Sequence, residues 1–189
     1  MTAPLPPHPQ TAPGVNQTVL QGEFKTSRDP NVVMTTLLGS CISACIWDAR
    51  ARIGGMNHFL LPGDDQASSE NMRFGINSME LLVNALISQG ASRSNLQVRL
   101  FGGAKMFDGG PNIGQRNTEF ARWFLENEGL NCVGACVGGN LGRKIRFWPV
   151  SGRAQRKFMD DARGLFQREM QTPAVPPARK RDSGDVELF

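Results

Sequence analysis

The sequence predicts one layered domain of the α/β or α+β class. Two observations predict it: short runs rich in β-branched and aromatic residues recur along the chain, and two segments of helical periodicity interrupt them. The chain has 189 residues, enough to bury a hydrophobic core of its own. We expect the folded domain to span residues 16–160, after a Pro-rich disordered leader at 1–15 and before a C-terminal extension at 161–189.

The first part of the domain is typical of β-strands. The strand-like runs cover residues 18–24, 31–38, 42–48 and 52–61. Residues 48–51, with the sequence DARA, are expected to form a hairpin turn between the last two runs.

The period then changes to that of a helix. Apolar residues spaced by three and four predict an amphipathic helix over residues 70–88: Met72, Ile76, Met79, Val83, Leu86 and Ile87. Ser69 is placed to be its N-cap and Gly90 its C-terminal stop. A second helix is expected over residues 112–129, ending at Gly129. Further strands are expected at 96–103, 132–139 and 143–150, followed by a turn at Ser151-Gly152, a last strand and a short helix at 160–170.

The composition favours a cytoplasmic protein. There is no apolar run long enough to predict a transmembrane helix. The N-terminal residues lack the basic region and apolar stretch of a signal peptide. Without export, the four cysteines are expected to stay reduced.

The net charge of +4 is unevenly distributed. Between residues 143 and 158 there are six basic residues and no acidic one: Arg143, Lys144, Arg146, Arg153, Arg156 and Lys157. Such a patch suits an acidic partner. The alternation of basic with apolar residues in this run is equally typical of a strand with one buried face. The pattern is therefore weak evidence for nucleic acid, and we expect no nucleic-acid partner.

Cys41 is the cysteine best placed for nucleophilic chemistry. It follows Gly39-Ser40, a flexible pair whose backbone N–H groups are candidates for an oxyanion hole. A cysteine nucleophile needs a base, and the chain has two histidines, of which His8 lies in the leader and His58 in the folded part. Alternatively, His58 is a structural residue whose ring is hydrogen-bonded within a strand. Three nearby hydroxyls could orient its ring, and spacing does not choose among them: Thr35, Thr36 and Ser43.

Other site chemistries fit the sequence less well. Cys45, Cys132 and Cys136 are expected to be core residues. A four-cysteine zinc site is disfavoured because residues four apart on a strand lie about 13 Å from each other. The Gly-rich stretches at residues 101–110 and 137–144 fit neither nucleotide-binding pattern and are expected to be turns.

Five motifs follow one another along the chain: LGSCISACIWD, GGMNHFLLP, FGGAKMF, NIGQRN and GGNLGRKIRF…SGR. Together they make about residues 18–158 resemble a known family, the CheD chemoreceptor glutamine deamidases of bacterial and archaeal chemotaxis. This resemblance implies a single layered α/β domain of packed β-sheets with two main helices on one side, an α-β-β sandwich-like arrangement.

The resemblance also implies the roles of three residues. The nucleophile falls on Cys41, its catalytic partner on His58 and the third member of the triad on Thr35, six residues before the cysteine. Gly39 and Ser40 would supply backbone support for the oxyanion. The reaction would convert a protein glutamine to glutamate through a thioester, with methylester hydrolysis of glutamate by the same acyl chemistry, and with no metal or organic cofactor.

The expected partner is the cytoplasmic part of a chemoreceptor, with no membrane insertion. Arg143, Lys144 and Arg146 are candidates for docking it, since receptor helices of this class are rich in Glu and Gln. Some relatives also bind a CheC-type phosphatase. The alternative to an enzyme is a non-catalytic adaptor that binds receptor or phosphatase, but an adaptor would not need Cys41, His58 and Thr35 together.

Overall fold

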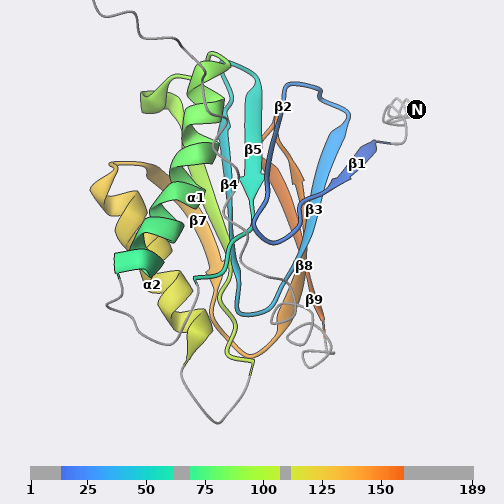
Figure 1. Ribbon diagram of the computed structural model, residues 1–189. Coiled ribbons are helices and arrows are strands. Elements are labelled where there is room, and N and C mark those ends of the chain that lie inside the picture. Colours follow the sequence, from blue (N-terminus) through green and yellow to red (C-terminus); the bar gives the residue numbers. More distant parts are fainter. Residues whose placement is uncertain (1–13, 62–68, 107–111, 160–189) are drawn as a thin grey trace, which may run out of the picture.

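The computed structural model describes residues 14–61, 69–106 and 112–159, which form three layers (Figure 1). One sheet has the strand order β1-β3-β8-β9 and is called sheet A; the other has the order β2-β5-β4-β6-β7 and is called sheet B. The strands of sheet A are β1 (Val15–Thr18), β3 (Val32–Leu38), β8 (Gly142–Trp148) and β9 (Arg153–Met159). Those of sheet B are β2 (Phe24–Ser27), β4 (Ile42–Asp48), β5 (Ile53–Asn57), β6 (Gln97–Gly102) and β7 (Asn131–Val137).

Two α-helices cover one face of sheet B. They are α1 (Ser69–Ser88) and α2 (Ile113–Asn127), and a short 3₁₀ turn, η1 (Arg93–Asn95), precedes β6. In Figure 1 both helices lie on one side of sheet B and sheet A lies on the other. The expected arrangement of packed sheets with two helices on one side is therefore confirmed.

Strand β4 shows why the middle layer is buried on both faces. All seven of its residues are buried. Ile42, Ala44 and Ile46 belong to the apolar core under the helices. Cys45 and Trp47 belong to a second core, between the two sheets. Because successive side chains of a strand point to opposite faces, one strand serves both cores.

The helical predictions are confirmed apart from their ends. Helix α1 begins at Ser69 itself, so this residue is not the N-cap that was expected. Gly90 does end the helix, with φ +96°, and its N–H donates to Ile87 while the N–H of Ala91 donates to Leu86. Helix α2 ends at Asn127, just before the expected Gly129.

The expected strand at residues 18–24 is wrong. Strand β1 ends at Thr18 and β2 begins at Phe24, with a turn between them. Gly22 has φ 82°, and the N–H of Glu23 donates to the carbonyl of Leu20. A positive φ is available to glycine at little cost, and it breaks an extended run. This turn lies beside His58, as described below.

Some predictions fall outside the described residues. They concern residues 1–13 of the leader, the short helix at residues 160–170 and the rest of the C-terminal extension, whereas Val15, expected in the leader, begins β1. Among the residues that are described, no helix is both long enough and apolar enough to cross a membrane.

Candidate active site

Cys41 and His58 are brought together by one antiparallel β-bridge, between Ile42 and Phe59. The N–H of each bridge residue donates to the other's carbonyl at 2.9 Å. Ile42 and Phe59 point to the helix side, so their neighbours Cys41 and His58 point toward sheet A. The two occupy diagonal positions of the pair, which lie about 7–8 Å apart at the backbone and within reach of a long side chain.

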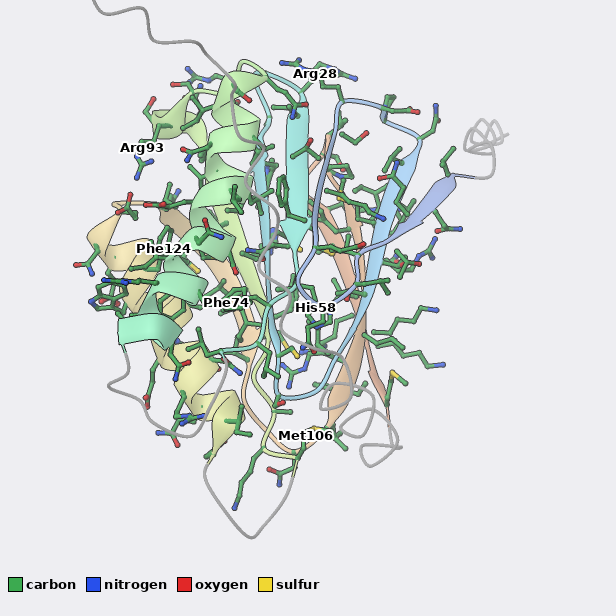
Figure 2. All side chains as sticks on the ribbon, viewed as in Figure 1. Arg28, His58, Phe74, Arg93, Met106 and Phe124 are labelled. Atoms are coloured by element: carbon green, nitrogen blue, oxygen red, sulfur yellow. The ribbon has the colours of Figure 1, made fainter. Side chains whose placement is uncertain are left out.

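The site is enclosed. The exposed fraction of Cys41 is 0% and that of His58 is 5%. Figure 2 shows His58 beyond the end of β5, while Phe74 and Phe124 lie with the helices. Apolar residues of the inter-sheet core pack with Cys41, among them Val32, Leu38 and Phe147. Charge that develops on a thiolate here is screened from bulk water, so nearby dipoles act strongly on it.

The loop that carries Cys41 is held by three consecutive carbonyl groups. The carbonyl of Gly39 accepts from the N–H of Ala104 at 2.8 Å, and that of Cys41 from the N–H of Gly103 at 2.7 Å. The carbonyl of Ser40 accepts from the Asn117 side chain at 2.9 Å. In a trans peptide the N–H points opposite to the C=O. Fixing the carbonyls of Gly39 and Ser40 therefore also fixes the direction of the N–H groups of Ser40 and Cys41.

Two glycines allow this close approach. A Cβ on Gly102 would lie 1.9 Å from the Cys41 carbonyl oxygen, and one on Gly114 would lie 2.3 Å from the carbonyl of Ala104. Gly102 also has φ +114°. Glycines of two sequence motifs, FGGAKMF and NIGQRN, thus allow the segments that support the Cys41 loop to approach one another closely.

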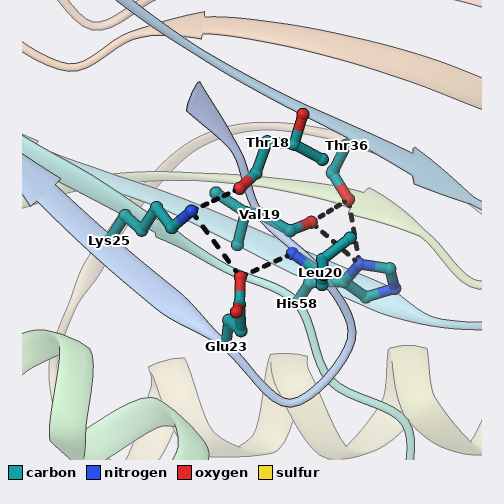
Figure 3. Close-up of polar contacts among 7 residues, drawn as sticks. All are labelled: Thr18, Val19, Leu20, Glu23, Lys25, Thr36 and His58. Carbon is teal, nitrogen blue, oxygen red and sulfur yellow. Dashed lines mark hydrogen bonds and ion pairs between the residues drawn. The ribbon is translucent and has the colours of Figure 1, made fainter. Parts of the chain in front are cut away.

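Thr36 holds the His58 ring. Its hydroxyl Oγ1 lies 2.8 Å from His58 Nδ1 and donates to the carbonyl of Val19 at 2.8 Å (Figure 3). A carbonyl can only accept, so the single hydroxyl proton of Thr36 is donated to Val19. The Thr36 oxygen therefore accepts from the Nδ1–H of His58. This network favours the tautomer in which Nε2 is the basic nitrogen.

The structure places Thr36, and not the predicted Thr35, against the His58 ring. On β3, Val32, Met34 and Leu38 face the inter-sheet core, and Thr36 shares their parity and is buried. Thr35 has the opposite parity and points to the outer face of sheet A, opposite Arg146 of β8. Thr35 contributes through its main chain, since its carbonyl accepts from the N–H of Val19 at 2.9 Å.

Two residues at the site were not predicted from the sequence. Asn117 is completely buried and, besides binding Ser40, accepts from the N–H of Leu61 at 2.9 Å. Gln21 accepts from the Cys41 thiol through Oε1 at 3.4 Å. Asn117 was within a quoted motif, but its role depends on a contact 77 residues away in sequence. Gln21 was not identified because the turn that carries it was predicted to be a strand.

The chain is similar in sequence to a family of chemotaxis proteins. Residues 60–158 match the family described as CheD chemotactic sensory transduction. Proteins named probable chemoreceptor glutamine deamidase CheD from Agrobacterium fabrum and Caulobacter vibrioides are each 46% identical to this chain, over 90% of it and over 94% and 91% of their own lengths. The protein of that name from Sinorhizobium medicae is 44% identical over 94% of this chain and 98% of its own.

The chain belongs to the CheD family. Among solved structures, a Neisseria meningitidis protein of the family DUF152 aligns with 62% of this chain and 52% of its own, at 11% identity and a TM-score of 0.40.

The basic run of this CheD protein divides between the core and the surface. Arg143 is 1% exposed, and its guanidinium donates to the carbonyls of Cys136 and Gly138. Arg143 is therefore unsuited to docking a partner. Lys144 and Arg146 are exposed, on the outer face of sheet A. They remain predicted docking residues.

The other cysteines differ from Cys41. Cys45 is buried, as expected, and burial raises the pKa of its thiol far above the ordinary value. Cys132 is exposed, so its prediction as a core residue is wrong, and Cys136 is half-buried. In the described part of the chain, no three His, Cys, Asp or Glu side chains are grouped so that they could hold a metal ion.

A cavity of about 290 Å³ lies on the helix side of sheet B, lined by residues that include Leu61, Met72, Phe120 and Trp123. Neither Cys41 nor His58 lines it. It is therefore separate from the candidate active site.

Proposed function

We propose that this CheD protein is a protein-glutamine deamidase that acts on chemoreceptors, with Cys41 as nucleophile and His58 as its base. The observation that carries the proposal is the His58 network: Thr36 and Val19 direct Nδ1–H away from the site and leave Nε2 as the basic nitrogen. The curated CheD relatives, which are named probable chemoreceptor glutamine deamidases, support the choice of substrate.

In the first step, His58 Nε2 takes the thiol proton and the Cys41 sulfur attacks the carbon of the glutamine carboxamide. The negative charge of the tetrahedral intermediate moves to the carboxamide oxygen. The N–H groups of Ser40 and Cys41, whose directions are fixed by the pinned carbonyls, are the proposed donors to that oxygen. The proton on His58 then passes to the nitrogen, the C–N bond breaks and ammonia leaves, giving a thioester.

In the second step, water attacks the thioester. His58 accepts a proton from the water, the C–S bond breaks and the proton returns to sulfur, so that a glutamate side chain and the free thiol remain. A glutamate methyl ester has the same acyl group with methanol as its leaving group, and we include its hydrolysis in the proposal. The residues named here provide every proton transfer.

We place the reaction in the cytoplasm, where cysteines stay reduced. A CheC-type phosphatase is a further proposed partner. A pull-down with purified phosphatase tests it, and absence of binding at micromolar concentrations would argue against it.

The deciding experiment incubates the protein with the cytoplasmic fragment of a chemoreceptor from the same organism. Peptide masses are read for conversion of glutamine to glutamate. We expect conversion by the wild type and by Cys132→Ala, whose cysteine is exposed and remote from His58. Cys41→Ala and His58→Ala should each reduce the rate by about 10³-fold or more.

The adaptor is the second candidate function. It predicts that wild type, Cys41→Ala and His58→Ala bind the receptor fragment equally and that none changes its mass. That result, with folding of all three verified by circular dichroism, would reject the deamidase.

A further inference from the structure

A glutamine of this chain already lies at the proposed nucleophile. Gln21 Oε1 accepts from the Cys41 thiol, with 3.4 Å between oxygen and sulfur. Cys41 is completely buried and Gln21 is half-buried, so the Gln21 side chain reaches from a partly exposed turn to the buried thiol. Its terminal group is a primary carboxamide, the same group that a glutamine deamidase must bind.

The turn that carries Gln21 is fixed to the residue that carries the base. The N–H of Gly22 donates to the carbonyl of His58 at 2.7 Å, and the N–H of His58 donates to the carbonyl of Glu23 at 3.0 Å. The N–H of Glu23 donates to the carbonyl of Leu20 and closes the turn. The Glu23 carboxylate in return accepts from the N–H of Leu20 at 3.0 Å (Figure 3). The Gln21 carboxamide is therefore aimed by a main chain that is anchored on both sides of it.

The contact has the right chemistry for a substrate position. The carbonyl carbon of an amide is about 1.2 Å from its oxygen, so an oxygen in contact with the sulfur places the carbon close to it as well. We propose that the Gln21 carboxamide occupies the position of the substrate carboxamide, and that a substrate glutamine must displace it to reach Cys41. This inference rests on the proposed function and identifies the subsite for the reacting group.

Displacement has two measurable consequences. A substrate competes with a group already bound in its place. Its apparent affinity is therefore reduced in proportion to the fraction of molecules in which the subsite is open. The thiol also donates its proton to Gln21, which stabilises the thiol over the thiolate. Removing the carboxamide should therefore make Cys41 more reactive and the substrate easier to bind.

The first test measures alkylation by iodoacetamide, in which the cysteine thiolate displaces iodide. Cys132, exposed on the same molecule, is the internal reference. Gln21→Ala should raise the alkylation rate of Cys41 about fivefold, the equivalent of one neutral hydrogen bond. Gln21→Glu keeps the shape but adds a negative charge beside the sulfur, and should lower it. Gln17→Ala, on β1, is the matched control and should change neither rate.

The second test measures receptor deamidation. Gln21→Ala should lower KM with kcat unchanged. Gradual conversion of Gln21 to Glu in the wild type, absent in Cys41→Ala, would also support the assignment, because only a carboxamide in the substrate position is attacked.

Two results would overturn the inference. One is a Cys41 alkylation rate that is the same in wild type, Gln21→Ala and Gln21→Glu. The other is a raised KM in Gln21→Ala, which would make Gln21 a group that binds substrate. If alkylation follows the expected pattern but no variant deamidates a receptor, the proposed function fails and the Gln21–Cys41 contact stands.

Discussion

The segment that carries Cys41 and the segment that carries His58 meet at one β-bridge, but different parts of the chain support them. The Cys41 loop is held by Gly103 and Ala104, which follow β6, and by Asn117 of α2. His58 is held from the N-terminal side, by the turn between β1 and β2 and by Thr36 of β3. The nucleophile therefore depends on residues far along the chain, and the base on residues near its beginning.

The difference shows how the nucleophile and the base are each positioned. The Cys41 loop is fixed through main-chain carbonyls, which set the backbone directions needed for an oxyanion hole. The His58 ring is fixed through a side-chain hydroxyl, which sets the position of a proton. A change on the first side should disturb the backbone geometry of the Cys41 loop, whereas a change on the second should act first on the orientation and tautomer of the His58 ring.

Among the residues that support Cys41 and His58, the largest effect is expected for Asn117→Asp. The carboxylate keeps the acceptor for Leu61 but loses the donor to Ser40, and it places a buried negative charge beside a carbonyl oxygen. Leaving such a group unsatisfied costs about 1–3 kcal/mol or more of stability. Misplacing the Cys41 loop should lower kcat about 10²-fold. Urea unfolding and receptor deamidation measure the two effects.

Gln115→Glu is the control for Asn117→Asp, because it makes the same chemical change at an exposed position of α2. It should leave kcat and the unfolding midpoint close to wild type. A loss of activity in Asn117→Asp no greater than in this control would show that the Ser40 carbonyl does not need its partner.

A smaller effect is expected for Thr36→Val, which removes the hydroxyl from Nδ1 of His58 but keeps the shape of the side chain. Partners that orient metal-bound histidines contribute about 10–100-fold to activity, and we expect a loss of similar size here. The fall should appear in kcat rather than KM, and Thr36→Ser should restore most of it. Thr35→Val is the matched control on the opposite face of the same strand. If Thr35→Val lowers kcat and Thr36→Val does not, the ring is positioned by the residue that the family resemblance indicated.

These adjacent threonines also mark where prediction from sequence succeeded and failed. Helical periodicity located both helices, because each buries one face over several turns. Motif resemblance pointed to Cys41 and His58, which the structure places at one bridge. The choice between Thr35 and Thr36 required the parity of β3 relative to the core, and a one-residue offset exchanges the faces. Gln21 and Asn117 could not be found because their roles rest on contacts between distant segments.

The smallest effect is expected at the outer face of sheet A. Lys144 lies opposite Leu37 of β3, close to where that strand leads into the Cys41 loop, and Arg146 follows on the same face. An acidic receptor surface would be attracted there, but exposed charges interact weakly and are screened by salt. The double variant Lys144→Glu, Arg146→Glu should raise KM for the receptor several-fold at low salt, with kcat unchanged, and the difference from wild type should shrink at high salt. The same reversal of Arg73 and Arg122, on the two helices across the molecule, provides the matched control. Equal KM values for the two double variants at low salt would remove sheet A from receptor docking and leave the active site as the place where the receptor is recognised.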